Sequence, residues 1–130
     1  MRTALSILAG FSAWTLLWCT SNYVAASLSP ASFGADGSVW DPALLTTFLV
    51  LSLAFSLLGG YLTARLARER AWTAAGILAG IQLLVGTFVQ ASYWDLMPLW
   101  FHLPFLAMLV PGILAGARVG AAAPARAPTT

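Results

Sequence analysis

The feature that most constrains this chain is the placement of its charged residues, which lie outside four long apolar stretches. These stretches cover about residues 4–26, 43–64, 71–91 and 98–117. A helix rising about 1.5 Å per residue needs roughly 20 residues to cross about 30 Å of hydrocarbon. In hydrocarbon, four segments satisfy their backbone hydrogen bonds only as helices. The sequence therefore predicts an all-α integral membrane protein, a bundle of four transmembrane helices.

Composition supports lipid as the solvent for most of the chain. The 130 residues are 60% hydrophobic and 8% charged, whereas soluble domains carry about 25% charged residues. The net charge is +2. We attribute this positive charge to cytoplasmic loops that contact anionic lipid. We therefore expect the lipid bilayer as a partner and expect no binding of nucleic acid. The chain has no lysine and much alanine, which suggests a GC-rich bacterial genome.

The sign of the charges alternates from one connection to the next. Every arginine lies before the first stretch, between the second and third, or after the fourth, namely Arg2, Arg65, Arg68, Arg70, Arg118 and Arg126. The other two connections hold Asp36, Asp41 and Asp95. This is the positive-inside pattern. It predicts a multi-pass protein of the bacterial inner (cytoplasmic) membrane, with both termini cytoplasmic.

The first stretch also has a second interpretation. Met1–Arg2, the apolar run and Val24–Ala26 together have the form of a secretory signal peptide with its cleavage site. The run is longer than the usual apolar region of about 7–15 residues. Cleavage would leave three helices with the same orientation.

Local signals set the expected helix ends. Asp41 followed by Pro42 reads as an N-cap with proline at the first helical position, and Asp95 is expected to cap the fourth helix in the same way. We expect a transmembrane domain over residues 1–119. The Ala/Pro-rich segment 120–130 is expected to be a disordered cytoplasmic tail.

The two halves of the chain share short patterns in the same order. These are Ile7–Gly10 with Ile77–Gly80, Trp40–Asp41 with Trp94–Asp95, and Gly59–Arg65 with Gly112–Arg118. They suggest two helical hairpins related by a parallel duplication. Coincidence in an Ala/Gly/Leu-rich chain is the alternative, because Ile113–Gly116 is a further copy out of register.

Chemistry-bearing residues are scarce within the apolar stretches. None of the four contains Asp, Glu, Lys or Arg, which disfavours ion-coupled transport, because such transporters place an ionisable group at membrane depth. The chain also lacks a phosphate-binding loop, paired cysteines and an HExxH motif. We therefore expect no enzyme activity, no cofactor and no metal site, and interpret Cys19 as a small packing residue.

Small residues recur at helical spacing on the last three stretches. The candidate helix-packing residues are Ser52, Ser56, Gly60, Gly76, Gly80, Gly112 and Gly116. Such faces let helix backbones approach closely in lipid. They serve either packing within one bundle or a homo-oligomer or docking face, and more small faces than one bundle needs would favour the second use.

The remaining polar residues gather toward the outer side. The candidate outer polar cluster consists of Asn22, Asp36, Asp41, Gln90, Asp95 and His102. It would form a pocket open to the outside, or else consist of helix caps and interhelical hydrogen bonds. Gln82 lies nearer mid-membrane and should find a partner on another helix. Pro104 and Pro111 lie seven residues apart on one face of the fourth helix and predict a kink there.

The stretches Gly59–Ala67 and Pro98–Gly112 resemble segments of uncharacterised small four-helix bacterial inner-membrane proteins. This resemblance implies a topology and no activity.

Our first hypothesis for the function is a non-catalytic accessory, assembly or scaffold subunit that packs against itself or a membrane-protein partner. The alternative is a small oligomeric permease or channel with a polar mouth on the outer side. A membrane enzyme or quinone site using His102 with Asp95 or Asp41 is the third.

Overall fold

The structure, a computed structural model, describes residues 1–124. Over these residues the prediction of an all-helical protein is confirmed. The α-helices are α1 (Arg2–Leu28), α2 (Pro42–Ala67), α3 (Ala71–Ser92) and α4 (Leu99–Ala122). Short 3-10 turns η1 (Pro30–Ser32), η2 (Arg68–Arg70) and η3 (Trp94–Leu96) lie in the connections.

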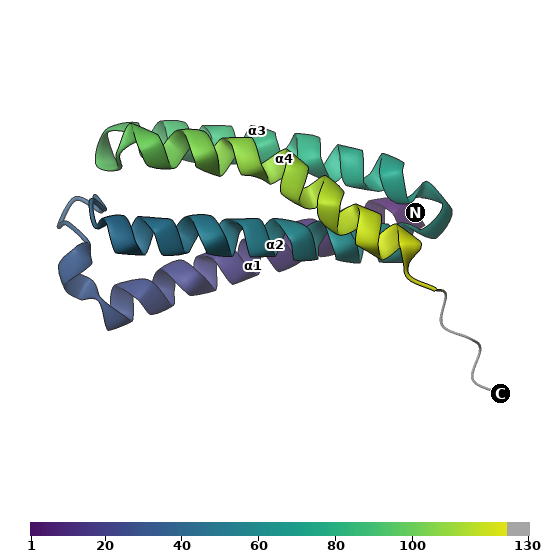
Figure 1. Ribbon diagram of the computed structural model, residues 1–130, viewed down its shortest axis with the longest axis horizontal. Coiled ribbons are helices and arrows are strands. Elements are labelled where there is room, and N and C mark those ends of the chain that lie inside the picture. Colours follow the sequence, from purple (N-terminus) through teal and green to yellow (C-terminus); the bar gives the residue numbers. More distant parts are fainter. Residues whose placement is uncertain (125–130) are drawn as a thin grey trace.

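Among residues 1–124, three helical stretches are long and apolar enough to cross a membrane. They are Arg2–Leu28, Pro42–Ser92 and Leu99–Ala122. The middle stretch has 51 residues and contains α2 and α3, which η2 joins. Figure 1 shows that the chain reverses direction at η2, so that α3 runs back alongside the rest of the bundle.

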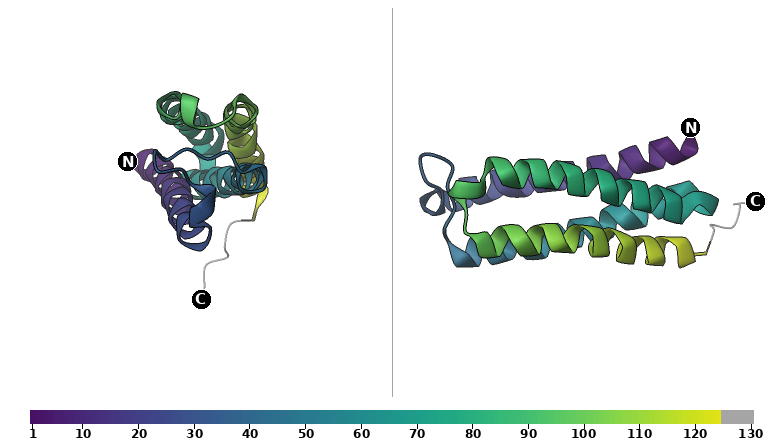
Figure 2. Two further views of the ribbon diagram at one scale, coloured as in Figure 1. Left: turned by 90° about the vertical axis from the view of Figure 1, so that its left-hand side faces the viewer. Right: turned by 90° about the horizontal axis from the view of Figure 1, so that it is seen from above.

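Successive helices run in opposite directions and sort the charged residues to two ends of the bundle (Figures 1 and 2). The arginine end holds the start of α1, the η2 turn and the end of α4, with Arg2, Arg65, Arg68, Arg70 and Arg118. The aspartate end holds the connections around η1 and η3, with Asp36, Asp41 and Asp95. The charges that alternate in sign along the sequence are therefore separated in space, at opposite ends of the long axis of the bundle.

Helix α2 is the central element and packs against α1, α3 and α4. Its approach to α4 is so close that only glycine fits. A Cβ atom added to Gly60 would overlap the carbonyl oxygen of Ile113, and one added to Gly116 would overlap that of Leu57. Toward the arginine end the core consists of small side chains, Ala64, Ala71, Ala75 and Ala117.

Aromatic side chains fill the core toward the aspartate end. The ring of Trp18 lies 5.2 Å from Phe105 and 5.5 Å from Phe48, and Trp14 stacks on Trp18 at 5.4 Å. Figure 1 shows the α1–α2 and α3–α4 hairpins apart at this end and converging toward the arginine end. The size of the core side chains accounts for the difference, because interior side chains fill the space between helices.

The two hairpins are not packed as equivalent halves. The backbones of α2 and α3 approach each other directly. The corresponding pair, α1 and α4, meets through the large rings of Trp14, Trp18 and Phe105. The duplication suggested by the sequence remains a prediction.

The end of α4 differs from its expected position. Residues 120–122, predicted to belong to a disordered tail, form the last turn of the helix. Gly120 is buried against the backbone of Tyr61, and Nη1 of Arg65 donates a hydrogen bond of 3.0 Å to the carbonyl oxygen of Ala123. A basic side chain at a helix C-terminus satisfies an otherwise unpaired carbonyl, and this contact stabilises the end of α4. Residues 125–130 of the predicted tail lie outside the described residues.

The two predicted N-caps had different outcomes. The Asp41 carboxylate accepts hydrogen bonds from the backbone N–H groups of Ala43 and Leu44, as predicted. The prediction for Asp95 was wrong, because Asp95 lies within η3, and α4 begins after Pro98 with no side-chain cap.

Helix α4 continues through both of its prolines, Pro104 and Pro111. Its first half packs on α3, where Gly86 faces the side chains of Leu106 and Leu109. Its second half packs on α2. Figure 1 shows this helix change direction between the two halves.

Candidate functional site

Of the six residues in the candidate outer polar cluster, the structure brings Gln90 and His102 together. His102 is fully buried, and its Nδ1 atom hydrogen-bonds with Oε1 of Gln90. Its Nε2 atom lies 3.2 Å from the carbonyl oxygen of Trp94. The imidazole also stacks on the Trp94 ring, with centroids 4.8 Å apart and planes at 13°. His102 thus links α3, η3 and α4.

Both ring nitrogens of His102 have hydrogen-bond partners inside the protein. Both ring nitrogens of His102 face oxygen atoms, yet a neutral imidazole donates only one hydrogen bond. Turning the Gln90 amide about its last torsion presents its NH2 group to Nδ1. Nε2–H then donates to the Trp94 carbonyl, and both bonds are made with a neutral ring. Since neither nitrogen faces a carboxylate, the geometry gives no support to a catalytic pair of His102 with Asp95 or Asp41.

Within residues 1–124, no other member of the outer cluster forms a hydrogen bond with His102. Asn22 donates to the carbonyl oxygen of Trp18 in its own helix. Asp95 is exposed in η3. Asp36 and Asp41 belong to the connection between α1 and α2. The six residues therefore do not line one pocket.

Hydrogen bonds hold both of these loop aspartates in their ionised form. The hydroxyl of Ser32 donates to Asp41 over 2.8 Å; this bond, together with the backbone N–H groups of Leu44 and Ala43, lowers the pKa of Asp41. The side-chain and backbone groups of Ser38 lower the pKa of Asp36. These carboxylates order the loop and the start of α2.

The two connections at the aspartate end are tied together, which the sequence reading missed. The backbone N–H of the buried Val39 donates to the carbonyl oxygen of Leu96 over 2.9 Å. Val39 also pairs with Phe33 in an isolated β-bridge. Gly37, with φ of +83°, turns the chain between them. The Asp36–Gly37 pair was the available signal, because this dipeptide favours a tight turn between extended residues.

At the opposite end, two adjoining hollows share Arg65, Leu66 and Arg68. The larger, about 720 Å³, lies between α2 and α4 and is lined by Tyr61, Ala64, Arg65, Leu66, Arg68, Gly120, Ala121 and Ala123. The smaller, about 280 Å³, lies between α1 and α2 and is lined by Arg2, Leu5, Ser6, Arg65, Leu66 and Arg68. We call the two together the arginine hollow.

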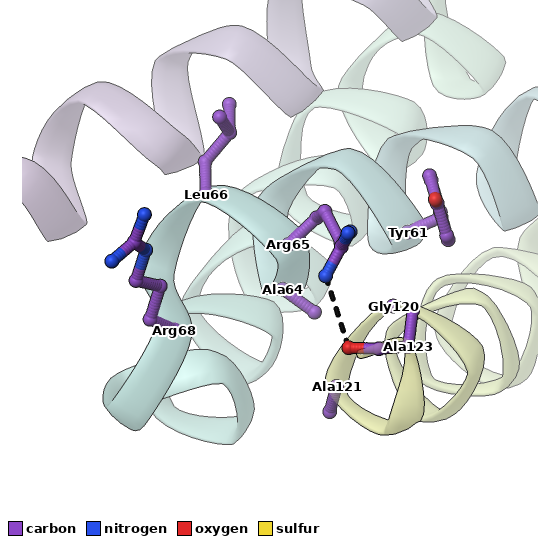
Figure 3. A pocket seen from close by; sticks show the side chains of 8 residues that line it. All are labelled: Tyr61, Ala64, Arg65, Leu66, Arg68, Gly120, Ala121 and Ala123. Atoms are coloured by element: carbon purple, nitrogen blue, oxygen red, sulfur yellow. Dashed lines mark hydrogen bonds between the residues drawn. The ribbon is translucent and has the colours of Figure 1, made fainter. Parts of the chain in front are cut away.

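The two arginines on α2 and η2 point to different sides of the arginine hollow. Figure 3 shows Arg65 reaching toward Ala123, the residue after α4, while Arg68 lies on the side facing α1. Arg68 has φ of +55° and ψ of −109°, and a positive φ is uncommon for residues other than glycine. The sequence showed these arginines only as topology signals, because their gathering around a hollow depends on how α1, α2 and α4 pack.

The candidate helix-packing residues divide into two groups. Five are buried between helices, namely Ser52, Ser56, Gly60, Gly112 and Gly116. Gly76 and Gly80 are exposed on α3, and a Cβ atom added to either would meet nothing within 4 Å. One small-residue face of the chain is therefore not used in its own bundle.

Polar groups inside the bundle mostly join helices. Nε1 of Trp14 donates to Oγ of Ser56, and Oγ1 of Thr63 donates to the carbonyl oxygen of Ser6, each over 3.1 Å. The side-chain oxygens of Ser52 and Gln82 are buried without a hydrogen-bond partner among residues 1–124. The expected interhelical bond is thus missing for this Gln82 oxygen.

Comparisons with known proteins assign no family to this arrangement. No family model matches the chain, and neither a curated protein nor a solved structure matches it. The resemblance to small four-span bacterial proteins stays a prediction.

Proposed function

We propose that this chain is a four-span protein of a bacterial inner membrane, with α2 and α3 as separate crossings and both termini cytoplasmic. Large apolar side chains are exposed around the bundle between its two charged ends, among them Leu16, Leu84, Phe88 and Leu103. Water would make such a surface unfavourable, and lipid would not. The gathering of arginines at one end supports the orientation.

Within that membrane, we propose a non-catalytic accessory, assembly or scaffold role in which α3 docks another transmembrane helix. The observation that carries this proposal is the outward position of Gly76 and Gly80, four residues apart with open space beside each. Elsewhere the chain uses Gly60 and Gly116 to let α2 and α4 approach closely. The α3 pair offers the same surface to a helix outside this bundle.

The exposed glycines are unfavourable for the isolated helix. Glycine inside a helix costs about 0.5–1 kcal/mol relative to alanine, and lipid contact alone requires no such gap in the surface. A second helix seated on Gly76 and Gly80 would offset this cost through backbone contact. The partner is either a second copy of this chain or another membrane protein.

The alternative of a permease or channel finds less support in the geometry. Ser52, Ser56 and Thr63, which would line a pore through a single bundle, are buried in the contacts between helices. Transport would then need a path formed between copies of the chain.

The test compares two double variants in native mass spectrometry after extraction in mild detergent. In Gly76→Leu/Gly80→Leu, bulk is added to the open face of α3, and the complex should be lost while the single chain stays folded. The matched control is Ala107→Leu/Ala115→Leu, which adds the same side chains at exposed positions of α4. It should keep the wild-type complex. Assembly unchanged by the α3 substitutions, or lost equally in both variants, would overturn the proposal.

A further inference from the structure

We propose that the arginine hollow binds the phosphate headgroup of an anionic phospholipid, with Arg65 and Arg68 as its principal ligands. This inference rests on the proposed topology, which places the arginine end at the depth of the cytoplasmic headgroups. Basic pockets between transmembrane helices on that side suit anionic lipid headgroups.

The charge in the hollow is positive. Among residues 1–124, Arg2, Arg65 and Arg68 contribute to the walls and no acidic residue does. Glu69 is the only acidic residue in the sequence segments at this end, and it lines neither hollow. A guanidinium group binds phosphate through two parallel N–H···O bonds, so an oxyanion is the ligand that this lining favours.

Arg65 is held in place before any ligand arrives. It is half-buried and donates one N–H to the carbonyl oxygen of Ala123 over 3.0 Å. A guanidinium carries five N–H groups, so donors remain for a ligand. Fixing the side chain in advance lowers the entropy lost on binding.

The apolar part of the lining favours a lipid over a soluble anion. Leu5 and Leu66 adjoin the arginines and are 58% and 47% exposed. In a bilayer these side chains would meet the acyl chains of a lipid whose headgroup reaches the guanidinium groups. A free phosphate ion would use the arginines and leave the leucines uncovered.

The backbone of Arg68 provides a variant that separates binding from folding. Its φ of +55° is unfavourable for every residue except glycine. Arg68→Gly removes the guanidinium while relieving the backbone, so the melting temperature should equal or exceed that of the wild type. If Arg68 only stabilised the fold, Arg68→Gly would not weaken lipid binding without also lowering the melting temperature.

The experiment measures lipid binding to the full-length, detergent-purified chain by native mass spectrometry. The probes are dioleoyl phosphatidylglycerol and, as the uncharged-headgroup control, dioleoyl phosphatidylcholine. We expect tighter binding of phosphatidylglycerol. Arg68→Gly and Arg65→Gln should each weaken it about fivefold, the equivalent of about 1 kcal/mol per arginine. Arg118→Gln is the matched control, because Arg118 is exposed at the same end but lines neither hollow. This variant should bind phosphatidylglycerol with the wild-type affinity.

Three results would overturn the inference. Equal binding of the two lipids would show that the hollow does not recognise an anionic headgroup. Equal weakening by Arg118→Gln and Arg68→Gly would indicate diffuse surface charge in place of a site. Displacement of phosphatidylglycerol by excess inorganic phosphate would assign the arginines to a soluble anion. Failure of the α3 docking proposal is distinguishable, because it would change the number of protein chains in the complex and leave the lipids bound per chain unchanged.

Discussion

At the scale of single residues, glycines in similar sequence contexts have opposite roles. Gly60 and Gly116 lie where a methyl group would strike the backbone of the neighbouring helix, whereas Gly76 has open space beside it. Only the first two therefore hold two helices at contact distance.

This difference gives a stability prediction. Gly60→Ala and Gly116→Ala should each lower the free energy of unfolding by about 1–3 kcal/mol or more, because the overlap is with backbone that cannot turn away. Gly76→Ala should leave the stability of the single chain unchanged or raise it by about 0.5–1 kcal/mol. Equilibrium unfolding in mixed detergent micelles measures all three. Wild-type stability in Gly60→Ala would show that α2 and α4 do not approach as described.

At the scale of elements, the start of α2 depends on an ionised cap. The pKa of Asp41 is lower in the folded chain than its unfolded value of about 3.9. Its carboxylate therefore stabilises the folded state above that pH, and this contribution is lost as the pH falls through the folded-state pKa. Thermal unfolding of the wild type should show falling stability below about pH 4.

The matched variant is Asp41→Asn, which keeps a capping oxygen but cannot titrate. It should melt below the wild type at pH 7 and show a flatter pH profile, with the remaining slope partly due to Asp36. Asp95→Asn is the control, because Asp95 does not cap α4. An unaltered pH profile in Asp41→Asn would contradict the proposed role of the cap.

The elements were predictable from the sequence, and their mutual orientation was not. Hydrophobicity over about 20 residues indicates a helix, and the Asp41–Pro42 pair marks where α2 starts. Which face of a helix meets a neighbour depends on its rotation, so the sequence could not separate Gly60 from Gly76. For the same reason it missed the contact of Arg65 with Ala123, which lies at the end of α4 and on one side of the arginine hollow.

At the scale of the whole molecule, charge and side-chain size are both graded along the long axis. Arginines and small core residues lie at one end, and aspartates and aromatic rings at the other. The order of charges in the sequence predicted the first gradient. The second follows from packing, because α1 to α4 contribute residues from distant parts of the chain to each level of the core.

The central claim is a chain that crosses the bilayer four times, with the arginine end in the cytoplasm. In a Cys19→Ala background, Ala35→Cys places one thiol at the aspartate end, and Glu69→Cys places one in η2; both positions are exposed. Each is treated with a membrane-impermeant maleimide on intact spheroplasts and again after permeabilisation. The account predicts labelling of Ala35→Cys in intact spheroplasts and of Glu69→Cys only after permeabilisation. The reverse pattern, or labelling of both thiols in intact spheroplasts, would contradict it.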